Sequence, residues 1–177
     1  PMLVGAVGVE GWRFEGEAVA WEGRFNSVYL LRDGEVEGAR YDKVHLTPFG
    51  EVMPYVSAWP WLERLLLGFG AAGMSFDLDA GASGRVFVIE GVGGARVGVV
   101  TPVCFELTVF GVCRDLVFSG GERRAGVMVH VTNDGWFGGW GGGKEHHLLQ
   151  ARWRASELRT PVVRAANTGV SAWIGRT

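Results

Sequence analysis

Short apolar runs separated by glycines and charged residues give this chain the patterns of strands and helices. Met2 to Val9 alternates small and β-branched residues, as a strand does. Asp33-Gly34 lies between the runs 26–32 and 36–40. This dipeptide favours the positive φ angles of a tight turn, so a β-hairpin is predicted. Further apolar runs predict strands at residues 86–90, 96–103, 126–131, 162–164 and 170–174.

Helical spacing of apolar residues predicts three helices: at Trp59 to Phe69, after Cys104, and at Lys144 to Arg159. The apolar face of the second helix consists of Leu107, Phe110, Cys113 and Val117. Cys113 is therefore expected in the core. The glycine-rich segments 10–23 and 138–143 are expected to be loops. Strands and helices interleave without internal repeats, which indicates an α/β or mixed α+β fold.

Composition limits the classes of protein to be considered. A chain of 177 residues fits one domain, and its net charge of −2 argues against a nucleic-acid partner. No apolar run approaches the roughly 20 residues that span a bilayer. The start, Pro1 to Val7, resembles a strand entered midway more than a signal peptide, so the domain is expected to be truncated at its N-terminus.

Cys104 is the first candidate for chemistry, because it follows a valine-rich strand that Pro102 ends. A thiol at a strand end can be held by rigid backbone and still face a substrate crevice. The alternative is that Cys104 is a small buried hydrophobe, as most free cysteines are. Lys43, Glu51 and Glu106 are the charged groups available to help the thiol. A lysine lowers a thiol pKa and stabilises an oxyanion, and a carboxylate carries protons.

Metal and nucleotide sites are not expected. His146 and His147 are adjacent on a predicted helix and point to different faces, and His45 and His130 have no neighbours spaced as metal ligands. The glycine run 138–143 lacks the spacing of a phosphate-binding loop. The sequence therefore predicts neither a metal nor a cofactor.

Four sequence motifs follow one another along the chain in a characteristic order. They are Tyr41-Asp-Lys43-x-His45-Leu-x-Pro48-Phe49-Gly50-Glu51-x-x-Pro54, Cys104-Phe105-Glu106, Thr132-Asn133-Asp134-Gly135-Trp136-Phe137-Gly138 and Arg164-Ala-Ala-Asn167-Thr168-Gly169-x-Ser171. They closely resemble the successive motifs of the apolipoprotein N-acyltransferases, a branch of the nitrilase (carbon–nitrogen hydrolase) superfamily. Phe105 and Gly135 depart from this pattern, since tyrosine and alanine are usual there.

The resemblance implies an α-β-β-α sandwich with a Glu-Lys-Cys triad, of which residues 1–177 form a partial domain. It assigns the nucleophile to Cys104, the triad lysine to Lys43 and the supporting carboxylates to Glu51 and Glu106. The general-base glutamate of the family belongs to an upstream motif that this chain does not contain. Residues expected to contact substrate are His45, Phe105, Asn133, Trp136 and Phe137.

The implied reaction moves an acyl chain from a phospholipid onto Cys104 as a thioester, then onto the α-amino group of a lipoprotein's lipidated N-terminal cysteine. The implied location is the bacterial inner membrane, reached through segments absent from this chain, with the catalytic domain on the extracytoplasmic side. Residues 59–69 and 136–140 are expected to offer apolar surface to acyl chains. Two alternatives stay open: a soluble amidase or nitrilase, and a catalytically inactive binding domain of the same fold.

Overall fold

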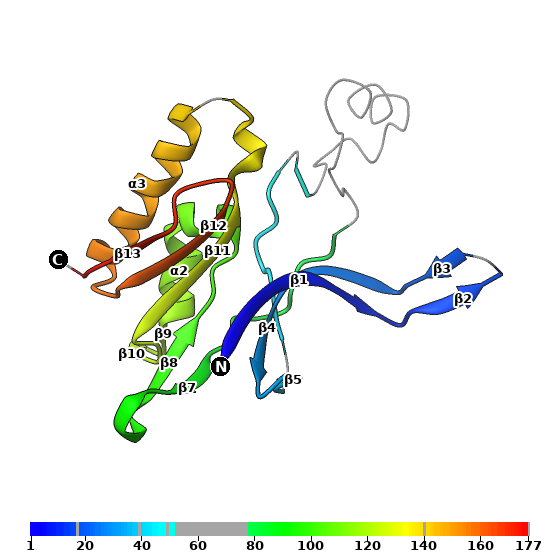
Figure 1. Ribbon diagram of the computed structural model, residues 1–177, viewed down its shortest axis with the longest axis horizontal. Helices are drawn as coiled ribbons and strands as arrows, with labels where there is room; N and C mark the ends of the chain where they lie inside the picture. Colours follow the sequence, from blue (N-terminus) through cyan, green and yellow to red (C-terminus); the bar gives the residue numbers. More distant parts are fainter. Residues whose placement is uncertain (17, 39, 49, 52–77, 140, 177) are drawn as a thin grey trace.

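The computed structural model describes residues 1–16, 18–38, 40–48, 50–51, 78–139 and 141–176, and it contains two main sheets (Figure 1). In the first sheet, β1 (Met2–Glu10) pairs antiparallel with β4 (Gly23–Arg32) along its whole length. Strand β4 also pairs with β5 (Glu35–Val36) and β6 (Tyr41–Asp42).

The predicted hairpin at Asp33-Gly34 is confirmed. Leu31 faces Val36 across the turn, and Asp33 and Gly34 have φ angles of 54° and 88°. The positive values are those that the Asp-Gly dipeptide accepts at low cost.

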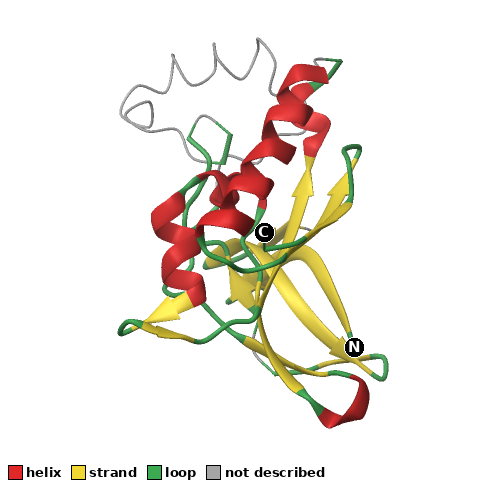
Figure 2. Ribbon diagram, turned by 90° about the vertical axis from the view of Figure 1, so that its left-hand side faces the viewer, coloured by secondary structure: helices red, strands yellow, loops and turns green. Residues whose placement is uncertain are grey.

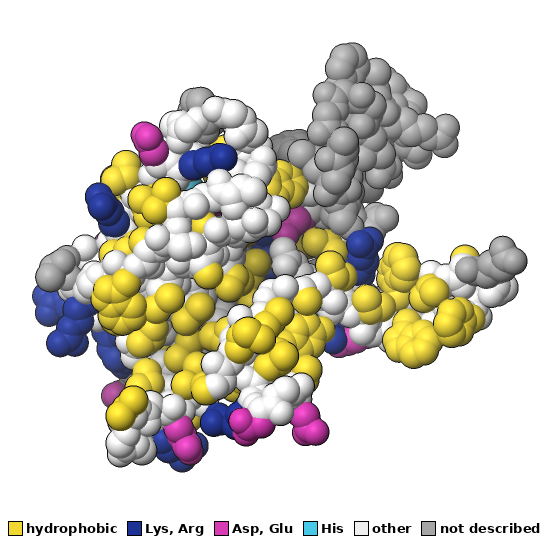
Figure 3. Space-filling view, in the orientation of Figure 1, with side chains coloured by type: hydrophobic (Ala, Val, Ile, Leu, Met, Phe, Trp, Pro, Cys, Tyr) yellow, Lys and Arg dark blue, Asp and Glu magenta, His cyan; other side chains and the backbone are white. Residues whose placement is uncertain are grey.

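The prediction of a loop between Glu10 and Gly23 is wrong in part. Strands β2 (Arg13–Glu15) and β3 (Ala18–Ala20) form an antiparallel ribbon there that projects from the body of the molecule (Figure 1). Hydrophobic side chains lie along this ribbon, with Trp12 and Phe14 exposed (Figure 3). Strands of three residues without a buried face leave no alternation for a sequence pattern to reveal.

The second sheet has the order β13-β12-β11-β8-β7. Its strands are β7 (Phe87–Glu90), β8 (Arg96–Val100), β11 (Val127–Asn133), β12 (Val162–Asn167) and β13 (Ala172–Ile174). The three central strands, β8, β11 and β12, run parallel. Their carboxyl ends therefore meet at one edge of the sheet, which is where ligands bind in open α/β folds.

Two α-helices, α2 (Phe110–Val117) and α3 (Gly141–Glu157), gather on one side of the strands (Figure 2). The shorter elements are the 3-10 helices η1 (Val92–Gly94), η2 (Cys104–Thr108) and η3 (Asp134–Phe137), and the ribbon of β9 (Phe118–Ser119) and β10 (Glu122–Arg123). The predicted helix 144–159 is confirmed, but α3 begins within the glycine run expected to be a loop.

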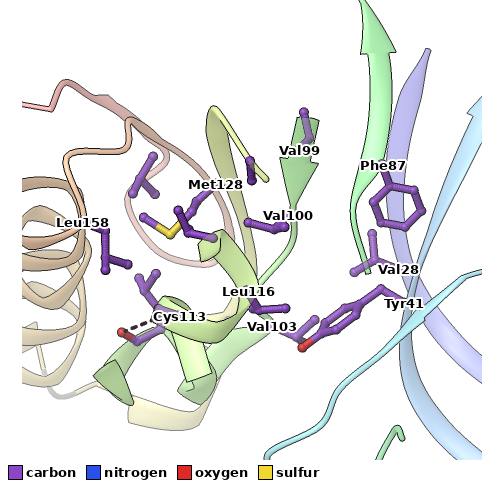
Figure 4. Close-up of a cluster of buried hydrophobic side chains, with 14 of the residues drawn as sticks. Val28, Tyr41, Phe87, Val99, Val100, Val103, Cys113, Leu116, Met128 and Leu158 are labelled. Carbon is purple, nitrogen blue, oxygen red and sulfur yellow. Dashed lines mark hydrogen bonds between the residues drawn. The ribbon is translucent and has the colours of Figure 1, made fainter. Parts of the chain in front are cut away.

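Buried apolar side chains join the two sheets and the helices into one core (Figure 4). Val28 and Tyr41 come from the first sheet, Val100 from the second and Leu116 from α2. The layers are thus helix, sheet and sheet within the described residues. Cys113 is fully buried, as predicted for the core.

One residue of the predicted apolar helix face is misplaced. Phe110 is 46% exposed, whereas Leu107, Cys113 and Val117 are buried. The reason is a break in the helix: Leu107 belongs to η2, and α2 begins only at Phe110. The 3.6-residue repeat does not continue across that break.

The predicted helix at Trp59 to Phe69 lies outside the described residues. In the part of the chain that the structure does describe, no helix combines the length and the hydropathy needed to cross a bilayer.

Candidate active site

Cys104 lies beyond the end of β8 and begins η2. Between them, Val103 pairs with Val131 of β11, so the parallel arrangement extends almost to the thiol. Cys104 has a φ of +50°, a value that is uncommon for a residue other than glycine. Its side chain is half-buried and lines a cavity of about 970 Å³. Backbone strain of this kind is typical of functional sites, where the surrounding structure holds one residue in place.

Glu106 connects the Cys104 turn with the loop that follows β6. Its carboxylate accepts hydrogen bonds from the backbone N–H groups of Val103 (2.7 Å), Val44 (2.8 Å) and His45 (3.0 Å), and from the Tyr41 hydroxyl (3.0 Å). Burial raises the pKa of Glu106, and the donors of Val103, His45 and Tyr41 oppose this rise. Burial also raises the pKa of Tyr41, which keeps its hydroxyl protonated as a donor.

Glu106 lies behind the wall of the cavity and not among its lining residues. Glu51 lines the cavity, whereas Glu106 does not. The physical reason is its set of donors: a carboxylate that accepts from three backbone N–H groups has to sit where those groups point, inside the protein.

Lys43 and Glu51 form an ion pair, and Glu51 lines the same cavity as Cys104. Lys43 is fully buried, and its ammonium also donates to Thr47 Oγ1 at 3.0 Å. Glu51 accepts further hydrogen bonds from Thr47 N (2.8 Å) and Asn26 Nδ2 (2.9 Å). Burial acts to raise the pKa of Glu51, but Lys43 and these donors outweigh it, so the pKa is lowered. Glu51 is thus a carboxylate at neutral pH.

Glu106 brings the Lys43 loop and the Cys104 turn together. The backbone of Val44 and His45, next to Lys43, and that of Val103, next to Cys104, donate to the same carboxylate. The positive charge of the Lys43 ammonium also opposes the rise that burial causes in the pKa of Glu106. The close approach of the Lys43 ammonium to the Cys104 sulfur, which the assigned Glu-Lys-Cys triad requires, stays a prediction.

A second polar network, which the sequence did not reveal, approaches Cys104 from inside the sheet. His130 Nε2 lies 3.0 Å from the Cys104 carbonyl oxygen, and His130 Nδ1 lies 2.9 Å from Arg164 Nη1. Arg164 Nη2 donates to Asp134 Oδ2 at 2.6 Å, and Asp134 Oδ1 lies 3.0 Å from His147 Nδ1. All four side chains are buried.

The partners decide which ring nitrogen of each histidine carries the proton. Arg164 can only donate, so His130 Nδ1 accepts and His130 Nε2–H donates to Cys104. Burial lowers the pKa of His130 well below its usual range, and Arg164 and His147 act in the same direction. His147 Nδ1–H donates to Asp134, while burial lowers the pKa of His147. His147 lines the cavity, and its Nε2 has no hydrogen-bond partner in the described part of the chain.

The sequence did hold a signal for this network. His130 and Arg164 are polar residues inside apolar strands, at positions that face each other in the parallel register of β11 and β12. Charged side chains are rarely fully buried unless paired. A close approach completes the arrangement, because a Cβ on Gly169 would meet Asp134 Oδ2 at 2.1 Å.

Of the residues expected to contact substrate, four line the cavity and one does not. Phe105, Asn133, Trp136 and Phe137 lie in its wall. Trp136 is 47% exposed and packs over Gly50, where a Cβ would lie 3.0 Å from the ring. His45 is not among the lining residues; its ring stacks on Phe105 with centroids 6.2 Å apart.

Among the described residues, no group of three or more His, Cys, Asp or Glu side chains could hold a metal ion. Glu106 instead accepts from backbone N–H groups, and His130 and Asp134 are hydrogen-bonded to Arg164.

Comparison with known proteins places this arrangement in a family. The model of the carbon–nitrogen hydrolase family matches residues 2–176. The chain belongs to the carbon–nitrogen hydrolase family. It is 38% identical to an apolipoprotein N-acyltransferase from Rhizobium meliloti (strain 1021), over 84% of this chain and 25% of that protein. A relative of the same name from Geobacter metallireducens is 35% identical, over 95% of this chain and 29% of that protein.

The predicted resemblance to apolipoprotein N-acyltransferases is thereby confirmed, although the chain spans only about a quarter of the length of these relatives. Solved structures confirm the fold. A mutant of the Nesterenkonia AN1 amidase, from the nitrilase superfamily, superimposes with a TM-score of 0.57 at 17% identity, over 98% of this chain and 53% of that one. A carbon–nitrogen hydrolase superfamily protein from Xanthomonas campestris gives 0.53 at 22% identity, over 87% and 50%. The predicted nitrilase-like α/β sandwich is correct.

Proposed function

We propose that this chain carries the nucleophile of an apolipoprotein N-acyltransferase, with Cys104 as the residue that becomes acylated. The observation that carries the proposal is the position of Cys104, in a strained turn on the wall of a large cavity, with Glu106 joining that turn to the Lys43 loop. The relatives named apolipoprotein N-acyltransferase support the choice of reaction within the family.

In the first half-reaction, the Cys104 thiolate attacks the ester carbonyl carbon of a phospholipid. A C–S bond forms, the ester C–O bond breaks, and the leaving alkoxide takes up a proton to give a lysophospholipid. The oxyanion of the tetrahedral intermediate needs donors held in advance. The Lys43 ammonium and the Phe105 N–H are the donors that we assign to it.

In the second half-reaction, the α-amino group of the lipoprotein attacks the thioester. A C–N bond forms, the C–S bond breaks, and the Cys104 thiol is restored with the proton that the amine loses. A neutral amine outcompetes water for the thioester when water is excluded from the site. Phe105, Trp136 and Phe137 supply apolar surface in the cavity wall for that purpose.

In this scheme, Glu51 and Glu106 position their hydrogen-bond partners and do not transfer protons. The acceptor positions of Glu51 are occupied by Lys43, Thr47 and Asn26, and those of Glu106 by backbone N–H groups and Tyr41. A carboxylate occupied in this way fixes its partners and is poorly placed to exchange a proton with substrate. We therefore assign the general base to the upstream glutamate that the family resemblance implies.

The proposed acyl donor is a phospholipid and the proposed acceptor an apolipoprotein. The proposed location is the bacterial inner membrane, with the catalytic domain on the extracytoplasmic side and with attachment through parts of the protein outside this chain. The names of the relatives support these assignments.

The test is to incubate the full-length protein that contains this chain with phospholipid and to search the Cys104 peptide for a thioester by mass spectrometry. A lipopeptide acceptor is then added, and loss of the thioester is followed. Cys113→Ser is the matched control, because Cys113 is fully buried and burial raises its pKa to about 12. We expect acylation in wild type and Cys113→Ser, and none in Cys104→Ser.

Two results would contradict the proposal. A Cys104→Ser variant that acylates the acceptor at the wild-type rate would exclude Cys104 as the nucleophile. A thioester that water discharges as fast as the lipopeptide does would favour the amidase or nitrilase alternative.

A further inference from the structure

The peptide bond between Cys104 and Phe105 has its two polar ends in different surroundings. Its carbonyl oxygen accepts a hydrogen bond from His130 Nε2 at 3.0 Å, inside the protein. The bond is trans, so its N–H points away from that oxygen. In the described part of the chain, the Phe105 N–H donates to no acceptor. Cys104 and Phe105 both line the cavity.

The charged groups Asp134 and Arg164 keep His130 Nε2 a donor to the Cys104 carbonyl oxygen. Asp134 pairs with Arg164, Arg164 donates to His130 Nδ1, and His130 in turn donates from Nε2. Each of these groups is buried, so His130 keeps its proton on Nε2 and its Nδ1 stays an acceptor. Chains of hydrogen bonds in a low dielectric polarise one another, and a hydrogen bond to a peptide oxygen strengthens the N–H of the same peptide as a donor.

We propose that His130 is a positioning residue for acyl transfer, acting through the Cys104–Phe105 peptide. Its hydrogen bond holds the carbonyl inward and polarises the peptide, which makes the Phe105 N–H a better donor to the oxyanion. The inference rests on the proposed function, because the oxyanion forms only if Cys104 attacks an acyl carbonyl. The carbonyl of Cys104 is thus part of the chemistry, although it never touches substrate.

Three substitutions of His130 separate this role from a contribution to folding. His130→Gln keeps an amide donor at about the reach of Nε2, whereas His130→Asn places its amide too near the backbone to reach the Cys104 oxygen. His130→Leu removes the donor altogether. We expect the rate of Cys104 acylation to fall on the order of tenfold in His130→Asn and His130→Leu, with His130→Gln much closer to wild type.

The decisive readout compares two reactions of the same thiol in the full-length protein. Acylation by an ester passes through an oxyanion, while alkylation by iodoacetamide displaces iodide directly and forms none. Weaker donation by the Phe105 N–H lowers the rate of acylation and leaves the rate of alkylation nearly unchanged. A purely structural role for His130 would lower both rates together. Comparing His130→Gln with His130→Asn keeps the test decisive even if His130→Leu fails to fold.

Thr160→Val is the control for loss of a buried hydrogen bond elsewhere, since Thr160 is fully buried and bonds to Arg123 and not to this network. It should leave the ratio of acylation to alkylation at the wild-type value. Equal ratios in wild type, His130→Gln and His130→Asn would overturn the inference. If wild type itself forms no thioester on Cys104, the proposed function fails instead, and the two failures are thereby distinguished.

Discussion

At the scale of single residues, the two cysteines show how environment decides chemistry. Cys113 lies in the core, where burial raises its pKa to about 12, so it stays a thiol. Cys104 lies at a cavity wall with backbone geometry that few side chains adopt. The sequence already separated them: Cys113 fell on an apolar stripe, and its burial is confirmed, whereas Cys104 came at the end of a strand.

The ion pair of Lys43 and Glu51 is the residue-scale feature with the largest expected effect on stability. Glu51→Gln leaves a buried ammonium without its anion, which typically costs about 3–5 kcal/mol. We expect this loss in the free energy of unfolding at pH 7, measured by urea denaturation, together with loss of acylation. The double variant Lys43→Met/Glu51→Leu should be more stable than Glu51→Gln, because it leaves no unpaired charge.

The pH dependence of this difference has a definite sign. The pKa of Glu51 is lowered in the folded protein, so the stability it contributes is complete above the unfolded-state value of roughly 4.3 and is lost as the pH falls through the folded-state pKa. The gap in unfolding free energy between wild type and Glu51→Gln should therefore shrink below about pH 4. A gap that stays constant from pH 7 to pH 3 would contradict the assignment of Glu51 as the partner of Lys43.

At the scale of elements, the parallel strands explain why much of the site could be predicted. Cys104 follows β8, Asn133 ends β11 and Asn167 ends β12, so the sheet brings all three to one edge. Apolar runs and turn residues were enough to locate those strand ends. The sequence marks His130 and Arg164 as polar residues inside apolar strands, but their pairing depends on the register between β11 and β12, which neither strand encodes alone.

Close packing between the β12–β13 turn and η3 gives the element-scale prediction. Gly169→Ala places a Cβ against Asp134, so Asp134 has to move away from Arg164. We expect a loss of roughly 1–3 kcal/mol in unfolding free energy, as for overpacked cores, and slower acylation because the network behind Cys104 is disturbed.

Gly175→Ala is the matched control for that variant, since nothing lies within 4 Å of a Cβ at that position. Urea denaturation and thioester formation measure the two effects. If Gly169→Ala unfolds at the wild-type urea concentration and acylates at the wild-type rate, the network does not support Cys104.

At the scale of the whole molecule, the cavity combines a polar floor with an apolar wall. Among its lining residues, Glu51 forms an ion pair with Lys43, while Phe105, Trp136 and Phe137 present aromatic surface. Our expectation of apolar surface for acyl chains at residues 59–69 and 136–140 concerns two segments; the first lies outside the described residues, as does Trp140. Trp136 lies in the described part of the second segment and is half-exposed at the cavity, so it can test this expectation.

Trp136→Ala should therefore discriminate between long and short acyl donors. A long chain loses contact with the indole, so kcat/KM for a phospholipid donor is expected to fall about tenfold, while that for a short-chain ester changes little. Trp173→Ala is the control, because Trp173 is exposed on β13 and does not line the cavity. Donors of increasing chain length, assayed by thioester formation on Cys104, give the measurement. An equal loss for all chain lengths would mean that Trp136 supports the thiol's surroundings and does not bind acyl chains.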